Sequence, residues 1–118
     1  MAGVVERTKV WVITFGSCEV EPNYAFVVHE EPLKVDGWPM GPDRWYVTGI
    51  VSREQGAALD ALWKSQTCRM RCDGGTFEGV GFLVHKKPVY DVLDWRRQGW
   101  EFRILLSGNV VYTPLAAP

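Results

Sequence analysis

Residues 52–84 have the sequence SREQGAALDALWKSQTCRMRCDGGTFEGVGFLV, in which the period of the apolar residues changes twice. The first part has helical spacing, TCRMRC (67–72) alternates with period two, and TFEGVGFLV (76–84) follows a glycine turn. RWYVTGIV (44–51) before it and WEFRILLS (100–107) after it also alternate. The pattern predicts one helix set into an antiparallel sheet.

The predicted helix covers about residues 52–66 and has a clear start. Ser52 is a good N-cap, and Gln55 three residues later completes a capping box. We expect an apolar stripe to pack on the sheet. The stripe consists of Ala58, Leu59, Leu62 and Trp63, and the other side carries Arg53, Glu54, Asp60 and Lys64.

The hairpin after the helix is the strongest local signal. Cys68, Met70 and Cys72 alternate with polar residues and should face the core, and the Asp73–Gly75 segment supplies a tight turn. Gly79 and Gly81 lie on one face of the returning strand, which is typical of a bend in a curved sheet.

The N-terminal third predicts two strands and a long loop. KVWVITF (9–15) would place Trp11, Ile13 and Phe15 on one face, and YAFVVHE (24–30) forms the second strand. Residues 30–43 hold three prolines and two glycines, so they predict an exposed loop. Leu33, Trp38 and Met40 lie in this loop, with Trp38 either as a lid on the domain or as a contact with a partner.

The C-terminal part predicts an insertion, a core strand and a tail. Residues 85–99 form either an extended hairpin arm or a short helical excursion, and residues 108–118 form a tail that could add a last strand. Trp100, Phe102, Ile104 and Leu106 should face the core. The insertion supplies further candidate interface residues, namely Lys86, Lys87, Tyr90, Trp95, Arg96 and Arg97.

These elements predict a single domain over residues 1–118 of the β-rich α+β class. It would be a curved antiparallel sheet, or a split β-barrel or sandwich, with one packed helix. With 118 residues, of which 47% are apolar, the chain can bury a core without a disulfide or metal. The 30–43 loop, the 85–99 insertion and the 108–118 tail are the expected contact elements.

Charge and cysteine content exclude some classes of protein. The net charge is −1, so there is no overall attraction to nucleic acid or anionic membranes. Residues 1–43 carry seven acids and three bases (−4), and residues 44–118 seven acids and ten bases (+3), which could orient copies head to tail. Three cysteines, without a leader or a long apolar run, favour folding in a reducing cytoplasm.

No catalytic or metal constellation is recognisable. Cys68 and Cys72 would lie roughly 13 Å apart in one strand, too far for a shared zinc ion or a disulfide. Cys18 with a histidine is a generic arrangement, and no phosphate-binding loop is present. We therefore expect no cofactor, no metal and no catalytic residue. Arg69, Arg71 and the basic residues of the insertion leave nucleic-acid binding as a minor alternative, and Trp38 and Trp95 leave carbohydrate binding as another.

The order of elements over residues 44–107 resembles small structural proteins of tailed bacteriophages, of the tail-tip, baseplate or neck type. RWYVTGIV, SREQGAALDALW and DGGTFEG carry this resemblance. It implies a non-enzymatic subunit of a tail or tail-like particle, assembled in the host bacterial cytoplasm and located in the virion. The implied partners are copies of itself and other tail or neck proteins, without membrane contact and with neither nucleic acid nor a small molecule as the main ligand. A stand-alone binding module for carbohydrate or protein is the alternative, and a small enzyme the third.

Overall fold

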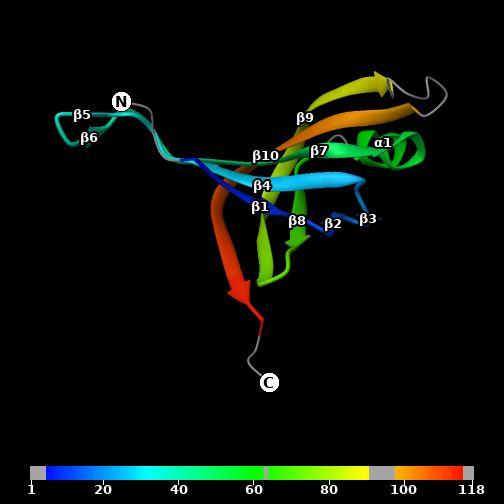
Figure 1. Ribbon diagram of the computed structural model, residues 1–118, viewed down its shortest axis with the longest axis horizontal. Coiled ribbons are helices and arrows are strands. Elements are labelled where there is room, and N and C mark those ends of the chain that lie inside the picture. Colours follow the sequence, from blue (N-terminus) through cyan, green and yellow to red (C-terminus); the bar gives the residue numbers. More distant parts are fainter. Residues whose placement is uncertain (1–4, 63, 91–97, 116–118) are drawn as a thin grey trace.

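The computed structural model of the protein describes residues 5–62, 64–90 and 98–115. Within them, strands dominate and are accompanied by one helix (Figure 1). In chain order the elements are β1 (Val5–Lys9), β2 (Val12–Phe15), β3 (Cys18–Val20), β4 (Tyr24–Glu30), β5 (Lys34–Val35), β6 (Trp38–Pro39), β7 (Arg44–Ser52), α1 (Arg53–Asp60), β8 (Gln66–Arg71), β9 (Gly75–Tyr90) and β10 (Gln98–Pro114).

The main sheet has eight antiparallel strands in the order β1-β4-β7-β10-β9-β8-β2-β3. The chain runs directly from β1, at one end of the sheet, to β2, the second strand from the other end, with only Val10 and Trp11 between them. The Val10 amide donates to the Ala25 carbonyl on β4, and the Trp11 amide donates to the Arg71 carbonyl on β8, both at 2.9 Å. The sheet therefore curls into a barrel, and the predicted β-rich α+β class with a curved antiparallel sheet is confirmed.

The N-terminal strand changes partner where the sequence predicted continuity. Ile13 and Phe15 are fully buried, but Trp11 is exposed and its ring nitrogen donates to Asp73 at 2.6 Å. The prediction that Trp11 shares their face is wrong. Alternation fails here because the chain leaves β4 and joins β8 between Val10 and Val12.

The helix begins as predicted but is shorter. Ser52 accepts from the Gln55 amide, and the Gln55 side chain accepts from the Ser52 amide. The helix ends at Asp60 instead of near residue 66, and Ala58 is exposed, so the predicted stripe is only partly right. Trp63 lies outside the described residues.

Contact with the sheet instead runs through Gly56 and Leu59, which are both buried. A side chain at Gly56 would lie 2.6 Å from Cδ1 of Trp100, so the glycine lets the helix approach this ring. Leu62 follows the helix and is only partly buried. One face of α1 packs on the sheet as expected, but with different residues.

The C-terminal half is longer in strand than predicted. Cys68, Met70 and Cys72 are buried as expected. β9 continues to Tyr90 and β10 starts at Gln98. The described part of the 85–99 insertion is therefore an extended β-hairpin and not a helical excursion. Residues 91–97 lie outside the described residues.

The 108–118 segment, predicted as a tail that could add a last strand, is strand as far as Pro114, where it forms the end of β10 and not a separate element. Its residues Val111–Thr113 pair with Thr76–Glu78 of β9. A register shift between Ser107 and Val111 adds residues to β10 opposite Gly79. Such a bulge bends a strand, and Figure 1 shows β10 turning sharply away from the barrel here.

The core fills the barrel and leaves two projections outside it. Its fully buried side chains are apolar and include Ile13, Phe15, Val47, Leu59 and Phe102. The radius of gyration is 15.4 Å, whereas a compact domain of this length has about 13.5 Å. The excess fits the projections in Figure 1, which are the β5–β6 hairpin and the lower part of β10 with β9.

Candidate functional site

The segment between β4 and β7, residues 31–43, projects from the barrel and is called the arm below (Figure 1). It is largely exposed as predicted, but it is an ordered hairpin and not a plain loop. Lys34 pairs with Pro39 and Val35 with Trp38. Asp36 and Gly37 have φ angles of 52° and 82°, which is the geometry of a two-residue hairpin turn.

Four large apolar side chains of the arm are exposed to solvent. The exposed fractions are 51% for Leu33, 55% for Val35, 75% for Trp38 and 67% for Met40. This exposure excludes the alternative that Trp38 is a lid on the domain core. An exposed apolar cluster on a projecting hairpin is typical of a contact surface.

A cluster around His29 fixes the base of the arm. His29 lies at the end of β4, and its Nε2 is 2.9 Å from Oδ2 of Asp43, just before β7. Its ring stacks on Trp45 with centroids 4.0 Å apart and an interplanar angle of 9°. Glu6 of β1 lies 3.9 Å from the other ring nitrogen. These contacts join both ends of the arm to the barrel.

A second contact reinforces this base. The Tyr46 hydroxyl donates to Glu30 at 2.7 Å, and Arg103 lies over the Tyr46 ring at 4.8 Å. Burial, and then the hydrogen bond to Glu30, raise the pKa of Tyr46 above its ordinary value. Tyrosine is already protonated at neutral pH with its ordinary pKa of about 10, so the upward shift extends the range in which the hydroxyl remains a donor to more alkaline pH.

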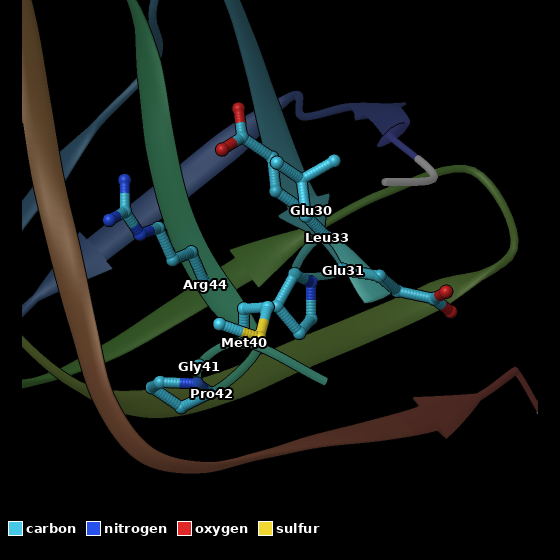
Figure 2. Close-up of a pocket in the computed structure, with 8 residues that line it drawn as sticks. Glu30, Glu31, Leu33, Met40, Gly41, Pro42 and Arg44 are labelled. Atoms are coloured by element: carbon cyan, nitrogen blue, oxygen red, sulfur yellow. The ribbon is translucent and has the colours of Figure 1, made fainter. Parts of the chain in front are cut away.

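A hollow of about 420 Å³ lies on the arm next to these anchors. Figure 2 shows Met40 and Leu33 at its centre, with the carboxylates of Glu30 and Glu31 pointing to opposite sides. The Met40 amide donates to the Leu33 carbonyl at 2.8 Å, which holds the two strands of the arm together below the hollow. The arm thus offers an apolar surface edged by the carboxylates of Glu30 and Glu31 and by the guanidinium of Arg44.

The second group of candidate residues lies on the β9–β10 hairpin. Lys86 is engaged within the chain, since its Nζ is 2.8 Å from Asp60 of α1 and lies over the Trp100 ring at 4.8 Å. Lys87 is exposed. Tyr90 ends β9, but its side chain is not described, and Trp95, Arg96 and Arg97 lie outside the described residues. The structure therefore brings Leu33, Trp38 and Met40 together but does not join Lys86 to them.

The cysteines and histidines do not form a reactive group in the described part of the chain. Burial raises the pKa of the Cys18 thiol, raises that of Cys68 to about 12 and, with Asp73, raises that of Cys72. His29 is held by Asp43, and His85 lies 3.2 Å from Glu101. Across residues 5–62, 64–90 and 98–115, no three His, Cys, Asp or Glu side chains come together as metal ligands.

A further hollow of about 360 Å³ lies over β4, β7 and β10. Aromatic and charged groups line it together, among them Tyr24, Phe26 and Tyr46 with Arg7 and Arg103. No sequence signal marked this site, because its members come from four strands that are distant in sequence.

The arm also contains features that the sequence prediction missed. Val35 was not among the candidates, although it is as exposed as Leu33. The Asp36-Gly37 pair between Val35 and Trp38 is a recognised hairpin signal and could have identified the turn. The prolines on both sides obscured it.

No family model, curated protein or solved structure matches this chain significantly. Among the described residues, no helix has the length and apolar character needed to cross a membrane.

Proposed function

We propose that this protein is a non-enzymatic structural subunit of a bacteriophage tail or tail-like particle, and that its arm binds a neighbouring subunit. The observation that supports the proposal is the exposure of Leu33, Val35, Trp38 and Met40 on an ordered projection. The resemblance of residues 44–107 to tail, baseplate and neck proteins supplies the type of particle.

The arm has the physical properties of a preorganised contact. The positive φ angles at Asp36 and Gly37 and the His29–Asp43 contact fix its shape before binding. The arm therefore loses little conformational entropy on binding, whereas a disordered loop would have to become ordered at a cost in binding free energy. Trp38 is the most exposed of the four side chains, and tryptophan is among the residue types enriched at hot spots.

The proposal is tested by measuring assembly of the purified chain, alone and with the proteins encoded beside it in its genome. Trp38→Ala should weaken association by about 2 kcal/mol or more, as at a hot spot, without lowering the melting temperature of the domain. Light scattering after size-exclusion chromatography, together with electron microscopy of the assemblies, measures the effect.

Trp11→Ala is the matched control, because Trp11 is also exposed but lies on the barrel outside the arm. It should leave assembly unchanged. If the wild-type chain stays monomeric with all of these proteins, or if both tryptophan variants assemble equally well, the arm is not the contact.

The hollow over β4, β7 and β10 favours the second candidate, a stand-alone carbohydrate-binding module. Tyr24, Phe26 and Tyr46 can stack on sugar rings, and Arg7 and Arg103 can bind hydroxyl groups. Binding of glycans by a monomeric chain, lost on Tyr46→Ala and unaffected by Trp38→Ala, would support this function in place of the first.

A further inference from the structure

The lower part of β10, residues 107–114, has a free edge. β10 pairs with β7 only from Gly99 to Leu106, whereas its pairing with β9 continues to Pro114. Among the described strands, none pairs with the side of β10 opposite β9 beyond Leu106. A strand with one unpaired side offers its N–H and C=O groups to another strand.

The alternation of the β9–β10 ladder identifies which groups are free. The Leu115 amide donates to the Gly74 carbonyl at 3.0 Å. In an antiparallel pair the direction of the backbone groups alternates from residue to residue, so Thr113 and Val111 also face β9. Val110 and Tyr112 therefore direct their N–H and C=O groups to the free edge, and Pro114 closes it because proline has no N–H.

This edge lacks the protection found on the other free edges. The side of β9 that faces β8 is unpaired beyond Gly81, and this part of the strand carries Lys86, Lys87 and Pro88, residue types that block strand addition. β1 contains Glu6, Arg7 and Lys9. In contrast, residues 104–115 contain no charged residue, and Val111 and Tyr112 are 58% and 45% exposed.

We infer that the 107–114 edge of β10 binds the same edge of a second copy, forming an antiparallel pair about a two-fold axis at Val111. This register places Val110 opposite Tyr112 of the second copy, so that all four free backbone groups of each copy are paired. Val111 then faces its own counterpart, and Asn109 faces Thr113. β-Branched and aromatic cross-strand pairs of this kind stabilise sheets.

The second copy fits this edge better than the arm does. A two-fold axis places identical residues near each other, so a charged strand would meet like charges when it pairs with a second copy. An uncharged strand avoids this repulsion. The arm offers strands of only two residues, and one of the four residues is Pro39. The arm also carries Glu31, Asp36 and Asp43, for which residues 104–115 provide no counter-charge. This dimer contact is independent of the arm contact proposed above.

Disulfide trapping tests the register directly. In a Cys18→Ser background, Val111→Cys should form a cross-linked dimer with a mild oxidant such as copper phenanthroline, since opposed residues in a non-hydrogen-bonded pair have Cα atoms about 4.5 Å apart. Val84→Cys, on an exposed valine of β9, is the control and should remain monomeric. Cross-linking of both variants to the same extent would overturn the inference.

Two further measurements separate this contact from the arm. Val111→Lys should weaken dimerisation about tenfold or more, because it places like charges directly opposite, whereas Val84→Lys and Trp38→Ala should not. Amide hydrogen exchange of Val110 and Tyr112 should slow at high protein concentration, while that of Val111, already bonded to β9, should not change. Self-association that is lost on Trp38→Ala but unaffected by Val111→Lys would refute the β10 contact and leave the proposed function standing.

Discussion

The helix end of the barrel and the arm end use large apolar side chains in opposite ways. At the helix end, Leu59 has no exposed surface and Gly56 lies directly on the Trp100 ring. At the arm end, Trp38 is 75% exposed although the hairpin that carries it is well fixed. The comparison teaches that buried and exposed large apolar side chains are located in different parts of this small domain. Changes at the two ends should therefore have separable effects.

The same substitution at the two ends should give the largest difference. Leu59→Ala removes a fully buried side chain and should lower the free energy of unfolding by about 2–5 kcal/mol. Leu33→Ala removes the same atoms from the arm and should change it by less than about 0.5 kcal/mol. Urea unfolding followed by tryptophan fluorescence measures both. Equal losses would mean that the arm is part of the cooperative core.

Sequence reasoning succeeded where one local pattern determines the outcome. Alternation gives the buried faces of Cys68, Met70, Phe102 and Ile104. The start of the helix follows from the capping box between Ser52 and Gln55. These features need no knowledge of the partner strand.

It failed where the outcome depends on which segments meet. Alternation predicts the face of a side chain but not the point at which a strand changes partner, so Trp11 was placed on the wrong face. The way α1 packs on the sheet depends on the fit of Gly56 against Trp100, 44 residues away in sequence. The pairing of Lys86 with Asp60 is also a contact between distant segments, and the sequence did not indicate it.

The candidate site shows the same division. The exposure of Leu33, Trp38 and Met40 followed from the prolines and glycines around them. Val111 and Tyr112, in contrast, lie in a segment that was predicted only as a tail that could add a last strand. Only the pairing of β10 with β9, combined with the end of β7, reveals the free edge there.

The buried thiol on β8 gives a pH test of the well-packed region. The folded-state pKa of Cys68 is raised from 9.0 to about 12. A raised thiol pKa contributes stability that is fully present below pH 9 and is lost as the pH rises towards 12, because the unfolded chain then releases a proton that the folded chain retains.

At pH 10 the loss attributable to Cys68 should be about 1.4 kcal/mol, the value of one pKa unit. It is measured as the difference in unfolding free energy between wild type and Cys68→Ala, at pH 8 and at pH 10. Taking this difference cancels the titration of all other groups that the substitution does not affect. A difference that is constant between the two pH values would show that Cys68 is solvated in the folded state.

The smallest effect concerns the ion pair that attaches the end of α1 to β9. Asp60 is the last residue of the helix, and the last turn contains no basic residue. A carboxylate there is unfavourable, because the C-terminal end of a helix carries partial negative charge. Lys86, at 2.8 Å and over the Trp100 ring, compensates for it from outside the helix.

The two single substitutions should therefore be unequal. Asp60→Asn removes the unfavourable charge together with the pair and should be nearly neutral, whereas Lys86→Met leaves the carboxylate uncompensated and should be more destabilising. A double-mutant cycle should give a coupling of about 0.2–1 kcal/mol, the range for partly exposed pairs, and 1 M salt should reduce it because the Debye length falls to about 3 Å. If Asp60→Asn is instead the more destabilising change, Asp60 has a structural role beyond its pairing with Lys86, and the attachment of the helix end would have to be explained by contacts of the carboxylate itself.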